Sequence, residues 1–329
     1  MLFGRRALLG TSLLTCALPP PARAVNAIRV GVLRFGTVSW EIDVIRHHAL
    51  DAAAGISVEP IELAAAQAAQ VALQAGRVDM IVVDWLWVAR QRGAGADWSF
   101  VPFSNAVGAL IASARSPVRD VPDLAGRALG VAGSPLDKSW LILRAFANKR
   151  YGIDVNAVTN KVFGPPPMLA EQMNAGRLDA LLTYWQFAAK AEASGARRIL
   201  SVEEAAGGLG VGLGVPYIGY TFSERWAGQD PGNPQRFFGA SRQARAILAT
   251  SDAEWERIAP LTGAADGAEL ERLREWYRRG IPRRWGEPER HAAQQLFEIL
   301  AGIGGPDLVG PTTEVPSGTF WPISWQSES

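Results

Sequence analysis

The sequence predicts an α/β protein of two similar lobes, each a mainly parallel sheet flanked by helices. Two observations predict this fold class. Apolar strand-like runs alternate with helical patterns from Ile28 onward, which favours right-handed crossovers onto parallel strands. AGRVDMIVVDWLW at 75–87 also returns, one hundred residues later, as AGRLDALLTYW at 175–185. With 329 residues and 48% hydrophobic composition, the chain is long enough for two lobes, each with its own core.

The elements of the first lobe follow in order. IRVGVL from Ile28 predicts a strand, and WEIDVIRHHAL from Trp40 predicts a helix because its apolar residues have helical spacing. Strands are then expected at 57–63, 79–83 and 98–103, with helices at 64–76 and 85–92.

The second lobe repeats this plan. Its expected strands are 127–133, 161–163 and 179–183, and its expected helices are 137–150, 166–176 and 184–195. A favoured helix-to-strand turn alone would explain the repeated glycines Gly76 and Gly176. It does not explain why Ser39-Trp40 returns as Ser139-Trp140 at the same offset.

Two segments are expected to join the lobes, 106–112 and the glycine-rich 207–220. The second suits a crossing strand that acts as a hinge, and its GLGVGLG fits no nucleotide-binding loop. Helices are expected at 234–250, 251–261, 266–279 and 288–303, packed on the first lobe. The predicted lobes are therefore 25–108 with 218–329, and 109–217.

The first 24 residues resemble an export signal, with a basic start, a short apolar run and Ala22-Arg23-Ala24 as a cleavage site. GRRALLG is a weak match to a twin-arginine signal, so general secretory export is favoured. Thr15 is larger than the residue usual before a lipidated cysteine, which disfavours lipidation of Cys16. Cys16 is the only cysteine, so a mature chain starting at 25 has no disulfide, thiolate nucleophile or cysteine metal ligand.

Charge excludes one class of partner. The signal segment carries three arginines and no acid, so its removal takes the 33 basic residues below the 32 acidic ones. A chain with fewer basic than acidic residues is not expected to have the broad positively charged surface that binds nucleic acid. No later segment is long and apolar enough in sequence to span a membrane.

Candidate binding residues lie where each strand meets the next helix, because ligands of parallel α/β sheets bind outside the carboxyl ends of strands. The candidate residues at these junctions, polar or aromatic except for one proline, are Thr37, Ser39, Trp40, Glu41, Asp84, Trp85, Ser134, Pro135, Asp137, Lys138, Trp140, Tyr184 and Trp185. For the tryptophans, core packing is the alternative. For Asp84, the alternative is a helix cap.

No catalytic or metal site is predicted. His47 and His48 are adjacent on a helix and are expected to point to different sides, so they suggest no shared metal. The sequence has no GxSxG elbow, and solvated or capping acids are commoner than a catalytic pair formed by Glu41 and Asp84.

VGVLRFGTVSW, AGRVDMIVVDW and VPDLAGRALGVAGSPLDKSW resemble the periplasmic substrate-binding proteins of ABC importers. The most similar class is the nitrate, taurine and alkanesulfonate group, which also includes binders of pyrimidine thiamine precursors. The resemblance covers residues 28 to about 222. It implies a Venus-flytrap (type II) fold, a periplasmic location, no cofactor, a membrane permease as partner, and a solute held between the lobes. It also adds Tyr217 to the expected contacts.

One departure from this group bears on the solute. Glu41, Asp84 and Asp137 lie near the expected cleft with Lys138 as the only nearby base, which disfavours nitrate or a sulfonate. A nitrogen heterocycle or an amine-bearing organic solute fits acids and aromatic walls better. Two alternatives stay open: an enzyme on the same scaffold, and an exported accessory protein that binds a periplasmic enzyme.

Overall fold

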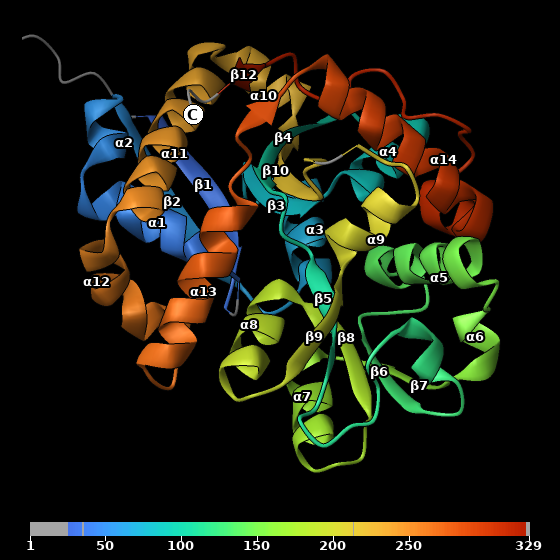
Figure 1. Cartoon of the computed structure of the whole chain (residues 1–329). Helices are drawn as coiled ribbons and strands as arrows, with labels where there is room; N and C mark the ends of the chain where they lie inside the picture. The colour runs from blue at the N-terminus through green and yellow to red at the C-terminus, as the bar shows by residue number, and fades with distance from the viewer. Residues whose placement is uncertain (1–25, 35, 213, 327–329) are drawn as a thin grey trace, which may run out of the picture.

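The computed structural model describes residues 26–34, 36–212 and 214–326. The predicted export signal and Cys16 lie outside these residues. The chain forms two five-stranded sheets flanked by helices, one above the other in the view of Figure 1. No helix among the described residues is long and apolar enough to cross a membrane.

The first sheet has the strand order β2-β1-β3-β10-β4. β1 pairs in parallel with β2 and β3, whereas β10 runs antiparallel between β3 and β4. Its strands are β1 (Asn26–Leu33), β2 (Ile56–Leu63), β3 (Met80–Asp84), β4 (Trp98–Ser104) and β10 (Ile218–Ser223). Segments far apart in the sequence thus build one sheet.

The second sheet has the matching order β7-β6-β8-β5-β9. β6 is parallel to β7 and β8, and β5 runs antiparallel between β8 and β9. Its strands are β5 (Gly108–Ala112), β6 (Ala128–Ala132), β7 (Asn160–Gly164), β8 (Ala180–Tyr184) and β9 (Arg197–Ser201). The lobe boundaries drawn from the sequence stay a prediction.

Helices connect the strands and cover both sheets. Those of the first 104 residues are α1 (Val38–His47), α2 (Leu50–Ala53), α3 (Ala66–Gln74) and α4 (Trp85–Gly93). Those around the second sheet are α5 (Lys138–Tyr151), α6 (Val155–Val158), α7 (Pro166–Asn174), α8 (Trp185–Ala193) and α9 (Val202–Gly208), after the 3-10 turn at Val121–Leu124. The C-terminal part contains α10 (Glu224–Gln229), α11 (Gly232–Thr250), α12 (Asp252–Thr262), α13 (Gly267–Gly280) and α14 (Glu287–Val309), with the short hairpin of β11 (Arg284–Trp285) and β12 (Trp325–Gln326).

The repeated stretch builds the same helix-to-strand turn in each lobe. Gly76 and Gly176 have φ of 65° and 71°, the left-handed conformation that glycine adopts most easily. The amide of Asp79 donates to Arg29 O at 2.8 Å, and that of Asp179 donates to Ala128 O at 2.8 Å. Each carboxylate accepts in return from the same residue's amide, at 2.7 Å and 3.0 Å. The shared residues of the repeat therefore serve the fold.

One expected connection was wrong in part, and one strand was missed. The segment 106–112 was expected to join the lobes, yet 108–112 form β5, a fully buried strand inside the second sheet. Residues 105–107 make the first crossing, and the second lies between the end of α9 at Gly208 and the start of β10 at Ile218. The strand β9 was not expected, because its Arg197 and Arg198 hide the apolar pattern that predicts a buried strand.

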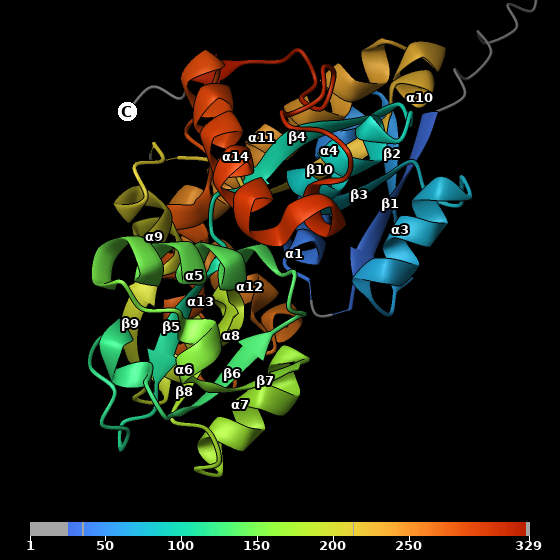
Figure 2. The same cartoon turned by 90° about the vertical axis from the view of Figure 1, so that its right-hand side faces the viewer.

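The C-terminal helices do not all pack on the first lobe as expected. α11 and α12 contact α1, but α13 packs on α8 of the second lobe, and α14 packs on both α4 and α5. In both views α14 lies over α5 (Figures 1 and 2). The helices α13 and α14 therefore pack against helices of the second lobe as well as of the first.

The expectation of a separate core in each lobe was also wrong. One buried apolar cluster includes Trp85 of the first lobe, Leu129 of the second and Phe297 of α14. The other includes Ile42 of the first lobe and Leu181 of the second. Each core therefore runs through both lobes.

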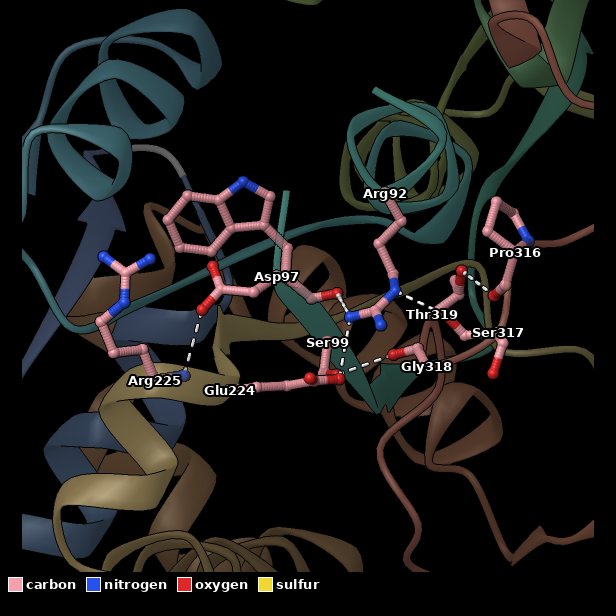
Figure 3. Close-up of polar contacts among 10 residues, drawn as sticks. Arg92, Asp97, Ser99, Glu224, Arg225, Pro316, Ser317, Gly318 and Thr319 are labelled. Atoms are coloured by element: carbon pink, nitrogen blue, oxygen red, sulfur yellow. Dashed lines mark hydrogen bonds and ion pairs between the residues drawn. The ribbon is translucent and has the colours of Figure 1, made fainter. Parts of the chain in front are cut away.

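The segment after α14, around residues 316–319, makes hydrogen bonds with residues of α4 and β4 (Figure 3). The guanidinium of Arg92 donates to Ser317 O at 2.7 Å, Trp98 O at 2.9 Å and Glu224 Oε1 at 2.8 Å. Ser99 Oγ donates to Gly318 O at 2.7 Å. Since β4 is an edge strand, this segment covers backbone groups that would otherwise face solvent.

Candidate functional site between the two lobes

Asp84 and Tyr184 hold matching positions in the two repeats and end equivalent strands beside the two crossings. Asp84 pairs with Ile218, the first residue of β10 after the second crossing. Tyr184 pairs with Gly108, the first residue of β5 after the first crossing. Both side chains therefore lie where one lobe passes into the other.

Asp84 caps the helix α4. Its Oδ1 accepts the amide of Trp87 at 2.9 Å, so the capping role weighed from the sequence is confirmed. The residue is half-buried. A carboxylate at a helix N-terminus is stabilised as an anion, so this end of the first lobe carries negative charge.

Asp137 and Tyr184 meet in the second lobe. Asp137 caps α5 by accepting the amide of Ser139 at 2.8 Å, and its other oxygen lies 3.4 Å from the Tyr184 hydroxyl. Burial raises the pKa of Tyr184, and the carboxylates of Asp137 and then Asp84 raise it further. Tyr184 is therefore a neutral phenol at physiological pH.

Gly133 makes room for this pair. Its φ is +93°, and a Cβ there would lie 3.0 Å from Asp137 Oδ2 and 3.1 Å from the Tyr184 hydroxyl. The following turn exposes Ser134 and Pro135, and Lys138 at the start of α5 is half-buried. The amide of Leu136 donates to Ser134 Oγ at 3.2 Å.

A third acid lies at the first crossing and was missed in the sequence. Glu203 Oε1 accepts the amide of Val107 at 3.0 Å, which links α9 to that crossing. Burial raises the pKa of Glu203, and burial followed by this acid raises that of Tyr217. Tyr217 is 3% exposed. The capping box of Ser201 and Glu204 in SVEE gave the only local signal, and it does not point to Glu203.

The four tryptophans among the candidates pack in the core, which was their alternative interpretation. Trp40, Trp85, Trp140 and Trp185 are between 1% and 4% exposed. Trp40 and Trp185 meet edge to face across the lobes with ring centroids 5.9 Å apart. As placed, these rings leave little surface for a solute.

The candidate residues at the start of α1 are also held by contacts within the protein. Glu41 is fully buried, accepts the Tyr220 hydroxyl at 2.8 Å and lies 3.7 Å from Arg245 Nε. Burial raises the pKa of Glu41, and Arg245 opposes that shift. Thr37 is buried at the start of α1, and Ser39 Oγ donates to Gly36 O at 2.7 Å.

The expectation that His47 and His48 point apart was wrong. Ligand atoms of His47, His48 and Glu254 all lie within 4.8 Å of one another. The helix α1 ends at His47, and His48 is its C-cap with φ −90° and ψ 7°. The two rings nevertheless meet, with centroids 4.9 Å apart.

The group formed by Asp84, Asp137 and Tyr184 can accept hydrogen bonds and balance positive charge. Two carboxylates are present and Lys138 is the one base in the adjoining turn, so an anionic ligand would meet repulsion here. The chemistry of these residues suits recognition.

Comparison with known proteins agrees with this architecture. Residues 51–249 match the family described as NMT1/THI5 like. The chain belongs to this family. No curated protein sequence matches the chain.

Several solved structures have a fold similar to that of this chain. The alkanesulfonate-binding protein SsuA from Xanthomonas axonopodis pv. citri, bound to MOPS, has a TM-score of 0.70 at 19% identity, covering 91% of this chain and 99% of that one. The periplasmic aliphatic sulphonate binding protein SsuA from Escherichia coli has a TM-score of 0.70 at 15% identity, covering 91% and 98%. A DSZB mutant in complex with biphenyl-2-sulfinic acid has a TM-score of 0.58 at 16% identity, covering 90% and 98%. The predicted two-lobe periplasmic-binding-protein fold is confirmed.

Proposed function

We propose that this protein is an exported solute-binding protein that holds a small organic solute between its lobes and delivers it to an ABC permease. The proposal is carried by two strand ends: Asp84 ends β3 beside the second crossing, and Tyr184, whose hydroxyl lies 3.4 Å from Asp137, ends β8 beside the first. A solute that touches groups on both lobes favours the closed form over the open one, and closure is what a permease can recognise.

The solute class follows from the charges. Asp84 and Asp137 offer acceptors in fixed directions because each spends one oxygen on a helix cap. The neutral Tyr184 hydroxyl can donate or accept, and its ring offers a flat face. An amine-bearing solute or a protonated nitrogen heterocycle fits these groups. A sulfonate, although it is the ligand class of the structural neighbours, would meet two carboxylates and one lysine.

Isothermal titration of the mature protein against a matched panel tests the proposal. The panel pairs amines and nitrogen heterocycles with sulfonates of equal size. We expect binding among the first group, and tighter binding at low salt because charge contributes. Tight binding of a sulfonate together with no amine or heterocycle binding would overturn the solute class while leaving the binding role intact.

Turnover distinguishes this role from an enzyme on the same scaffold. If a bound solute returns from the titration chemically unchanged, the binding role stands. Formation of product from it would show an enzyme instead. Co-purification with a periplasmic enzyme, without small-molecule binding, would favour the accessory role.

A further inference from the structure

We propose that His47, His48 and Glu254 form a binding site for a divalent transition metal such as Zn²⁺, separate from the site between the lobes. Figure 1 shows the two elements involved, α1 and α12, packed together on the first lobe. The histidines end α1, whereas Trp40 and Glu41 near its beginning belong to the region of the strand ends. The site therefore lies at the opposite end of α1.

The end of α1 brings the two imidazoles together. Their ring centroids are 4.9 Å apart at an interplanar angle of 90°. Ala49, which follows, has φ 51° and is the only non-glycine residue with positive φ among those described. This left-handed residue turns the chain sharply into α2 and leaves both rings on the side of α12.

The separations match a zinc site. His48 Nε2 lies 3.2 Å from Glu254 Oε1. Two ligands at ordinary Zn–N and Zn–O distances in a tetrahedral site lie roughly 3.3 Å apart. The third ligand atom lies within 4.8 Å of the others, and His47 is exposed, so rotation of its side chain can close the remaining gap. Two histidines and one carboxylate leave a fourth position for water.

The surrounding charges also favour a cation. Glu254 Oε1 accepts from Arg257 Nε at 3.0 Å and from Arg257 Nη2 at 2.7 Å, and the same guanidinium bonds Asp43. The two carboxylates of Asp43 and Glu254 face one guanidinium, that of Arg257. An ionised carboxylate has about four acceptor positions on its two oxygens, so Arg257 does not exhaust Glu254.

Titration of the metal alone tests this site. The mature, untagged protein is titrated with ZnCl₂ by calorimetry and with CoCl₂ by visible absorption, which reports tetrahedral nitrogen and oxygen ligation. We expect one equivalent to bind. His47→Ala, His48→Ala and Glu254→Gln should each weaken binding by at least about tenfold, because each removes one of three ligands.

His291→Ala is the matched control, since it removes an exposed histidine from another helix. It should leave the affinity unchanged. Glu254→Gln also loses the ion pair with Arg257, so its thermal melt is measured beside that of His47→Ala, whose imidazole has no ion-pair partner among the described residues. Binding that is equally tight in His47→Ala and His48→Ala, or no one-equivalent binding by the parent protein, would overturn the proposal. Neither result bears on solute binding between the lobes.

Discussion

At the scale of single residues, Asp84 combines a helix cap with a negative charge, and two substitutions can separate these roles. Asp84→Asn keeps an oxygen for the amide of Trp87 and removes the charge, whereas Asp84→Ala removes both. We expect Asp84→Asn to change the free energy of unfolding little and to weaken binding of a cationic solute by roughly 1.5–3 kcal/mol, the worth of a charged hydrogen bond. Asp84→Ala should in addition lose about 1 kcal/mol of stability.

Asp266→Asn provides the control for this pair. Asp266 caps α13 by accepting the amide of Glu269 at 2.9 Å, the same bond that Asp84 makes, but it is exposed. It should affect neither stability nor binding strongly. Urea unfolding and calorimetry on the three variants give both quantities. If Asp84→Asn binds as tightly as the parent, Asp84 is a cap alone.

The positions of polar residues at strand-to-helix junctions could be predicted from the sequence. The positions of residues that depend on tertiary packing could not. Asp84 and Asp137 were found because a polar residue between strand and helix has a definite position in a parallel α/β sheet. Glu203 sits one residue into a helix, and only the pairing of β9 with β5 brings it to Val107. The tryptophans were ambiguous in sequence because a ring at a strand end can face the core or the solute.

At the scale of elements, α1 and α11 are joined by the buried pair of Glu41 and Arg245. Removing one partner of a buried pair leaves the other charge uncompensated, so Glu41→Leu should cost about 3–5 kcal/mol. The double variant Glu41→Leu with Arg245→Leu should recover most of that loss. Urea unfolding of the parent, both single variants and the double variant gives the coupling energy. Additive losses would show that the pair does not act as a unit.

The pH dependence of this pair has a definite sign. Burial raises the folded pKa of Glu41 above its ordinary value of 4.5. The folded state then binds more protons than the unfolded state between these two pKa values, so this group's contribution to stability falls as pH rises. The free energy of unfolding of the parent, relative to Glu41→Gln, should decrease from pH 4.5 upward. A difference that rises with pH would mean that Arg245 dominates and the pKa is lowered.

Elements were predicted best where the apolar pattern was periodic and bounded by glycine. The turns at Gly76 and Gly176 follow their helices as expected, because the left-handed glycine and the aspartate three residues later are both local signals. The strand β5 was mistaken for a linker since a short apolar run looks alike in a crossing and in a central strand. Its role depends on β8 and β9, which pair with it from either side.

At the scale of the whole molecule, the two lobes share their cores. The C-terminal helices α13 and α14 carry apolar side chains to both lobes, which length and composition could not reveal. The NMT1/THI5-like chain therefore has two separate sheets of similar topology, but each of its buried apolar clusters contains residues of both lobes. Any closure around a solute has to proceed without parting these shared clusters.

This packing predicts one cooperative unfolding transition. Trp40 of α1, Trp185 of α8, and Trp255 and Tyr277 of the C-terminal helices form an aromatic cluster that joins both lobes. Trp40→Ala should lower the free energy of unfolding by about 3–5 kcal/mol, the cost of emptying a buried aromatic site. Both lobes should still unfold together, because the second shared core, around Trp85 and Phe297, stays intact. Calorimetry together with urea unfolding, followed by tryptophan fluorescence and by far-ultraviolet circular dichroism, should give coincident transitions for parent and variant. Two resolved transitions in the parent would mean that the lobes are independent domains, and that the shared clusters contribute little to holding them together.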